Sequence, residues 1–315
     1  MINQKYAPFN KMMSTINADK DIDPSFKTAL QQRIISTRGN DLLNYQSIHN
    51  FLNKTEIELP TDFYSTLEAV DYGAPYLLHF EENRQLGINW ASKDISFQDY
   101  PSVSAYFKAT TEATEKKYGN TLLTDYCSLD NIYNNINFGG GIDDAEPMIE
   151  QFKASAKNQY MLTKLAEYVK PWANLKSGSD APDFIAKKRD DVDVTLSSLK
   201  GKKVYIDVWA TWCGPCIQEI PALKELESEL HDEPIEFVSI SIDQMRDKEK
   251  WLQFITEKEL SGLQLFADGD WTSDLTTAYN IKGIPRFLLI DEAGKIISAN
   301  APRPSDPSIR EVLLN

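Results

Sequence analysis

A Cys-Gly-Pro-Cys sequence at residues 213–216 lies between a stretch typical of a buried β-strand and a stretch typical of an α-helix. Residues 203–209 are mostly apolar and β-prone, and residues 215–230 carry apolar side chains at helical spacing. Together they place Cys213 at the start of the helix, where unpaired backbone N–H groups and the helix dipole favour a thiolate. A second sulfur within one helical turn can form a readily reversed disulfide, so the pattern predicts dithiol–disulfide exchange.

A Cys-x-x-Cys pair is also half of a common zinc site, which takes four ligands. The remaining candidates are Cys127, His49, His79 and His231, and none of them forms a second pair at ligand spacing. The same pair beside alternating strands and helices is typical of a redox motif. We therefore expect no metal and no bound cofactor. Cys127 lies in an apolar helical stretch and is expected to be buried and unreactive.

The composition is that of a globular protein with room for two domains. The chain has 315 residues, of which 42% are hydrophobic and 25% charged. Its net charge of −14 would repel phosphate backbones, so nucleic acid is not an expected partner.

Two cellular locations are compatible with the sequence. No apolar run is as long as a membrane span, and residues 1–6 lack the apolar core of a secretory signal. The protein is then either cytoplasmic or exported. If it is exported, we expect a signal, with or without a membrane tether, upstream of Met1.

Residues 1–175 show helical patterns and form one predicted domain, mainly α-helical, whose role the sequence does not indicate. Gly39 is expected to end the first of its helices. The expected helices cover residues 24–38, 42–52, 63–80, 103–118 and 145–169. A segment rich in turn-forming residues at 176–182 marks the boundary to a second domain, 176–315.

In the second domain, short apolar runs alternate with helical patterns. Strands are expected at 184–186, 192–194, 203–209, 235–242, 263–266, 286–290 and 295–298. Helices are expected at 215–230, 248–257, 271–279 and 307–314. Residues 291–294 predict a hairpin turn between the last two strands. This alternation predicts an α/β architecture with a central sheet.

Three groups of residues within 178–315 together resemble the thioredoxin superfamily, and within it the TlpA/ResA-type thiol-disulfide oxidoreductases of bacterial cell envelopes. They are Ala-Pro-Asp-Phe at 181–184, Trp-Ala-Thr-Trp-Cys-Gly-Pro-Cys at 209–216 followed by Pro221, and Gly-Ile-Pro at 283–285 before a strand. The resemblance implies a thioredoxin-like fold with a central mixed sheet and flanking helices. It also implies a cis peptide at Pro285, facing the disulfide, and a periplasmic or cell-envelope location.

The catalytic roles follow from the helix position and from this resemblance. Cys213, nearer the helix start and expected to be more exposed, should attack, and Cys216 should resolve the mixed disulfide. Asp207 lies in an otherwise apolar strand, where its pKa should be raised. It matches the buried acid of thioredoxin, which assists proton transfer, although it could instead cap or pair structurally. Thioredoxin pairs that acid with a lysine on the next strand, and residues 237–241 offer none.

Residues on both sides of the cysteine pair are expected to contact the substrate. Ile284 and Pro285 would present backbone to an extended partner strand. The family resemblance implies that Pro285 also discourages metal capture by the cysteine pair. Trp212, Gly214 and Pro215 would surround the sulfur, although Trp212 could simply pack. Arg286 could favour acidic partners, help hold a thiolate, or have only a surface role.

The sequence therefore predicts a thiol-disulfide oxidoreductase that reduces protein disulfides and is recharged by a separate thiol electron donor. One alternative is a peroxiredoxin-like peroxidase, indicated by residues 181–184. The proline that peroxiredoxins carry before their reactive cysteine is missing from residues 207–212. Another alternative is a partner-binding protein in which the helical region binds and the thioredoxin-like domain is its redox-regulated end.

Overall fold

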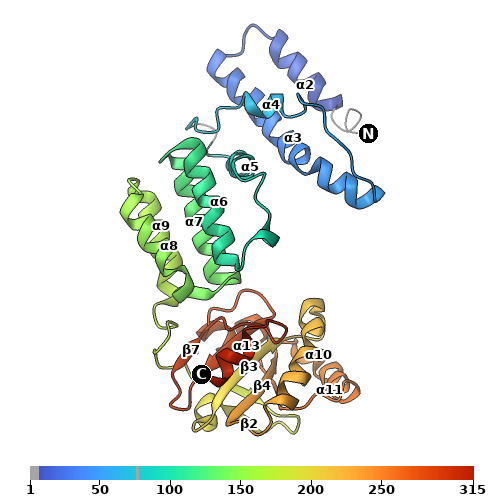
Figure 1. The fold of residues 1–315 in the computed structure, drawn as a ribbon, viewed down its shortest axis with the longest axis vertical. Helices are drawn as coiled ribbons and strands as arrows, with labels where there is room; N and C mark the ends of the chain where they lie inside the picture. The colour runs from blue at the N-terminus through green and yellow to red at the C-terminus, as the bar shows by residue number, and fades with distance from the viewer. Residues whose placement is uncertain (1–6, 76–77) are drawn as a thin grey trace. The chain divides into compact units, whose positions relative to one another are not determined.

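A computed structural model describes residues 7–75 and 78–315 of the chain (Figure 1). The chain forms two compact units. The N-terminal unit extends to Asn131 and includes Glu150–Leu162, and the C-terminal unit comprises Ile132–Ile149 and Thr163–Asn315. The C-terminal unit thus contains two segments that the sequence patterns assigned to the helical region. Residues 1–6, on which the signal argument rested, lie outside the described residues.

Helices make up the part of the chain before residue 176. They are α2 (Ala7–Ala18), α3 (Pro24–Asn53), α4 (Ser65–Glu68), α5 (Glu81–Ala91), η1 (Phe97–Asp99), α6 (Val103–Tyr118), α7 (Leu122–Phe138), α8 (Gly141–Ser155), α9 (Gln159–Val169) and η2 (Lys170–Trp172). Their buried side chains in the N-terminal unit form one apolar cluster that includes Leu42, Leu67, Leu86, Trp90 and Leu123. Among the described residues, no helix has the length and apolar character needed to cross a membrane.

Several of these helices differ from the sequence prediction. Gly39 does not end a helix, because α3 continues through it and a Cβ there would lie 2.4 Å from Leu86 Cδ2. The glycine therefore permits close packing between α3 and α5. The single helix expected at 145–169 is two helices, α8 and α9. The helix expected at 63–80 is reduced to α4, and residues 76–77 of that range lie outside the described residues.

The C-terminal unit is built on a seven-stranded sheet of order β2-β1-β5-β4-β3-β6-β7. Its strands are β1 (Ile185–Lys187), β2 (Asp193–Thr195), β3 (Lys203–Trp209), β4 (Ile235–Ser241), β5 (Leu263–Phe266), β6 (Arg286–Ile290) and β7 (Ile296–Ser298). Strands β3, β4 and β5 run parallel, while β6 is antiparallel to β3 and β1 is antiparallel to β5. The predicted mixed sheet is confirmed, as is the hairpin between β6 and β7.

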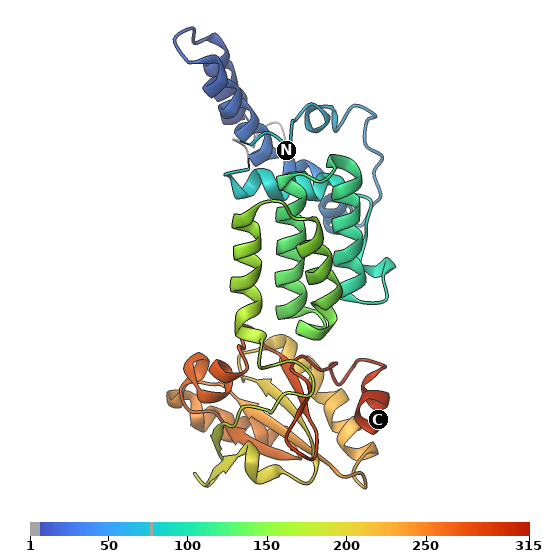
Figure 2. The same ribbon diagram turned by 90° about the vertical axis from the view of Figure 1, so that its left-hand side faces the viewer.

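Helices cover this sheet and bury the strand that leads to the cysteines (Figure 1; Figure 2). They are η3 (Leu196–Leu199), α10 (Gly214–Glu229), η4 (Met245–Asp247), α11 (Lys248–Glu257), η5 (Asp270–Thr272), α12 (Asp274–Ala278) and α13 (Ile309–Leu314). Helices α10 and α13 pack on the face that presents Tyr205. All seven residues of β3 are buried, so Asp207 lies inside the core rather than at an edge.

Candidate active site

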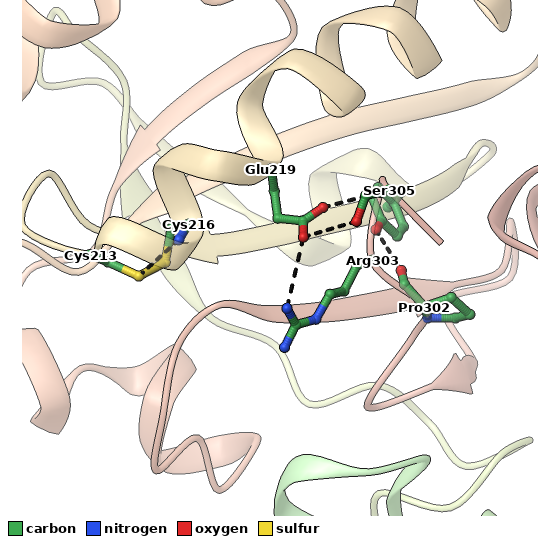
Figure 3. A network of polar contacts seen from close by, with 7 residues as sticks. Cys213, Cys216, Glu219, Pro302, Arg303 and Ser305 are labelled. Carbon is green, nitrogen blue, oxygen red and sulfur yellow. Dashed lines mark hydrogen bonds and ion pairs between the residues drawn. A yellow bond between two sulfur atoms is a disulfide. The ribbon is translucent and has the colours of Figure 1, made fainter. Parts of the chain in front are cut away.

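The two cysteines of the motif form a disulfide at the N-terminus of α10 (Figure 3). Their Cα atoms are 5.3 Å apart. Cys213 is the residue that caps α10, and its sulfur accepts a hydrogen bond from the Cys216 N–H at 3.2 Å. A backbone N–H in the first turn, which has no carbonyl partner within the helix, thus points at the first sulfur, and this arrangement stabilises a thiolate.

Cys213 was expected to be more exposed than Cys216, but in this disulfide-bonded state the two residues differ little. Cys213 is 4% exposed and Cys216 is 2% exposed. The neighbouring residues Trp212, Gly214 and Pro215 are exposed instead. Access to Cys213 therefore depends on these residues around it.

Two tryptophans lie together beside the disulfide. Trp212 is 52% exposed, and its ring centroid lies 6.3 Å from that of Trp271, which is 40% exposed. Sequence reasoning missed Trp271, because it lies beyond α11 and no local pattern links it to the motif. The pair extends the apolar surface expected around the sulfur.

The loop before β6 has the backbone geometry that the resemblance implied. The peptide bond between Ile284 and Pro285 is cis, and both residues are partly exposed. Contact of this loop with a substrate strand stays a prediction.

Asp207 is a buried acid with an unsatisfied oxygen. It is 7% exposed, and its Oδ1 has no hydrogen-bond partner among the described residues. Burial, followed by the nearby carboxylates of Glu219 and Glu227, raises the pKa of Asp207 to about 8. Ser239 lies opposite Asp207 in the β3–β4 register, at the place where a lysine would neutralise the acid.

A second buried acid, Glu219, lies three residues after Cys216 on α10 (Figure 3). Its carboxylate accepts hydrogen bonds from the Ser305 N–H and Oγ, both at 3.0 Å, and lies 3.8 Å from the Arg303 guanidinium. Sequence reasoning missed Glu219. The available signal was an acid at helical spacing from Cys216, which puts both side chains on one face of α10.

Two of the three roles left open for Arg286, contact with acidic partners and a surface role, need an exposed side chain, and both are wrong. Arg286 is 2% exposed. Its guanidinium donates to the carbonyls of Asn137 at 2.6 Å and Ala299 at 3.3 Å, and it lies 5.5 Å from the Trp172 ring centroid. Asn137 is in the last turn of α7, where unpaired carbonyls and the helix dipole favour a cation. Arg286 therefore anchors the strand after Pro285 to residues that precede the redox motif in the chain.

Replacing Arg286 is expected to destabilise the C-terminal unit. Arg286→Ala would leave two buried carbonyls without their donor and remove a large buried side chain, which should cost about 2–4 kcal/mol of unfolding free energy. Guanidinium chloride unfolding, followed by circular dichroism, measures this change. Arg246→Ala removes an arginine side chain that is 80% exposed and should change stability by less than about 0.5 kcal/mol. Equal effects of the two substitutions would contradict the anchoring role.

The third cysteine lies away from the redox pair in sequence and is buried, as predicted. Cys127 is 0% exposed, and burial raises the pKa of its thiol to about 11. The Thr114 hydroxyl and the Asn131 amide each lie 3.4 Å from its sulfur. Within residues 7–75 and 78–315, no group of three or more histidine, cysteine or acidic side chains is placed to hold a metal.

The second half of the chain is similar to known redox proteins. The family described as Redoxin matches residues 176–313. The thioredoxin-like protein YneN of Bacillus subtilis is 30% identical over 129 residues, which cover 41% of this chain and 74% of YneN. The thiol-disulfide oxidoreductase ResA of Bacillus cereus is 27% identical over 39% of this chain and 68% of ResA.

A solved structure is similar over the same part of the chain. The crystal structure of the thioredoxin domain of a thiol-disulfide oxidoreductase from Bacteroides vulgatus is 28% identical, covers 44% of this chain and 96% of that domain, and has a TM-score of 0.40. The sequence relatives, the mixed sheet and the cysteine pair at the start of α10 lead to one assignment. The chain belongs to the thioredoxin superfamily, among its TlpA/ResA-like thiol-disulfide oxidoreductases.

Proposed function

We propose that this protein reduces disulfides in other proteins by cycling Cys213 and Cys216 between dithiol and disulfide. The observation that carries the proposal is the bonded pair at the tip of α10, with the Cys216 N–H directed at the first sulfur. The oxidised form described here corresponds to the state left after a substrate has been reduced.

The cycle balances without a bound cofactor. In the dithiol form, the Cys213 thiolate attacks a substrate disulfide, forms a mixed disulfide and releases one substrate thiolate. Cys216 then loses its proton and attacks the Cys213 sulfur, which releases the second substrate thiolate and restores the disulfide. The two electrons gained by the substrate come from the cysteine pair, and a separate thiol donor must return them.

The surrounding residues have separate proposed roles. Asp207 accepts the proton of Cys216, since its buried carboxyl lies on the strand that leads to the motif and its pKa is close to the range where a base works. Trp212, Gly214 and Pro215 contact the substrate beside the sulfur, and Ile284 and Pro285 pair with its backbone. Arg286 holds that loop from within the core.

We also propose in which direction the protein transfers electrons and in which cellular compartment it works. The Gly-Pro pair between the cysteines is the dipeptide of reducing thioredoxins, which favours a reductant over an oxidant. The family resemblance favours the periplasm or cell envelope as the location. The division into a helical domain, 1–175, and a redox domain, 176–315, stays a prediction. The helical domain is then the candidate for partner binding.

Reduction of insulin in the presence of dithiothreitol tests the activity, and equilibration with glutathione or dithiothreitol couples tests the direction. We expect catalysed precipitation of insulin chains and a potential close to thioredoxin's, about −270 mV. A potential near that of strong oxidants, about −120 mV, would overturn the assignment as a reductant.

The peroxidase alternative draws no support from the segment that raised it. Asp183 Oδ1 accepts hydrogen bonds from the N–H groups of Phe184 at 3.1 Å and Ser197 at 3.0 Å. This carboxylate therefore ties the start of β1 to η3, which is a structural task. A peroxide-consumption assay separates the two activities.

A further inference from the structure

A small cavity, lined by both polar and apolar residues, adjoins the buried acid Asp207. It offers about 10 Å³ to the centre of a water molecule, close to the smallest space that one water needs. Among the lining residues, Asp207 Oδ1, Trp209 Nε1 and Gln264 Oε1 have no hydrogen-bond partner within the described part of the chain. Three unpaired polar atoms around such a space are the setting in which a buried water is stable.

The same cavity adjoins the protein surface at Lys224, Glu227 and Ser261. Glu227, on α10, lines this cavity and also lines an open hollow of about 310 Å³ on the surface, together with Lys224 and Ser261. The Ser261 hydroxyl donates to Glu227 Oε2. A Cβ on Gly262, where φ is 65°, would lie 2.8 Å from Glu227 Oε1, so the glycine leaves room for the carboxylate. Glu227 thus stands between Asp207 and bulk water.

We propose that Glu227 relays protons between Asp207 and solvent, through one water in the cavity. The inference rests on the proposed function, because it supplies the exit for the proton that Cys216 gives up. After Asp207 accepts that proton, it passes it to the water, and the water passes one to the Glu227 carboxylate, which releases a proton to bulk solvent. Each transfer moves one proton, and the sequence returns Asp207 to the protonation state that it had before Cys216 gave up its proton.

The charged groups near Asp207 and Glu227 set how readily Glu227 takes up and releases a proton. Lys224 and Glu227, both on α10, line the cavity. Glu219 on α10 and Tyr205 on β3 do not line it, but each interacts electrostatically with Asp207. Lys224 Nζ donates to the Lys258 carbonyl at 3.1 Å. Burial, the largest effect, raises the pKa of Glu227, while the hydrogen bond from Ser261 and the charge of Lys224 lower it. Glu227 therefore holds a proton more readily than an exposed glutamate, as a relay between a buried acid and water requires.

Glu227→Gln in the full-length protein tests the relay. Stopped-flow measurement separates formation of the mixed disulfide, which needs Cys213, from its resolution, which needs Cys216 to lose a proton. We expect Glu227→Gln to slow resolution at least about tenfold at pH 7, to leave formation unchanged and to be partly rescued by acetate buffer. A role limited to packing would not respond to the buffer.

Glu236→Gln is the matched control, because Glu236 lines only the outer hollow and pairs there with Lys202 at 2.7 Å. It should leave both steps unchanged. Unchanged resolution in Glu227→Gln, or equal slowing of both steps without rescue, would overturn the relay while the redox cycle stands. A wild-type protein that forms no mixed disulfide would overturn the proposed function and the relay with it.

Discussion

Cys216→Ser is expected to accumulate a covalent complex with its substrate and to lose turnover by at least about a thousandfold. The variant keeps the Cys213 sulfur at the start of α10, so attack on a substrate disulfide still occurs. A serine hydroxyl cannot displace the substrate from the mixed disulfide, and the complex persists. Non-reducing electrophoresis followed by mass spectrometry identifies the complex, and insulin reduction measures the turnover.

Two further cysteine variants serve as controls for the trapping by Cys216→Ser. Cys213→Ser should trap nothing, because the attacking sulfur at the helix tip is gone. Cys127→Ser should behave as the wild type in both assays, since Cys127 is fully buried in the N-terminal unit. If Cys213→Ser trapped substrate as well as Cys216→Ser does, the two cysteine roles would be assigned the wrong way round.

The sheet was largely predictable because its signals are local. Strands β3, β5 and β6 and helix α11 have the bounds expected from the sequence, since each combines a clear apolar pattern with turn residues on both sides. The helical region was less predictable, because its helix ends depend on packing. Gly39 is a stop signal in sequence, but it lies within α3, where the missing Cβ leaves room for Leu86 of α5.

Some residues of the candidate site could be predicted from short sequence patterns, and others could not because only the fold brings them to the site. Cys213 and Cys216 lie in one continuous motif, and Asp207 is the only charged residue between Val204 and Trp209, so the sequence alone singles them out. Glu227 and Trp271 reach the site through the fold, from positions that no short pattern connects to the cysteines. The buried guanidinium of Arg286 binds the carbonyl of Asn137, which lies at the end of α7 and 149 positions earlier in the chain.

The buried carboxyl of Asp207 is expected to make stability fall as pH rises. Its native pKa of about 8 lies above the ordinary value of 3.8, so between these pH values the folded protein holds a proton that the unfolded chain has lost. Unfolding free energy should then fall by about 1.4 kcal/mol per pH unit, or about 4 kcal/mol between pH 4 and pH 7. Above pH 8 the loss is complete, and below pH 3.8 it is absent.

Asp207→Asn removes this loss, because an amide does not ionise. The free energy of unfolding of the variant, minus that of the oxidised wild type, should rise by about 4 kcal/mol from pH 4 to pH 7 and level off above pH 8. Urea unfolding at each pH, followed by tryptophan fluorescence, measures the difference. Asp232→Asn, at a side chain that is 89% exposed, should show no such rise. If the Asp207→Asn difference were the same at pH 5 and pH 8, the carboxyl would have an ordinary pKa and could not serve as the base for Cys216 in the way proposed.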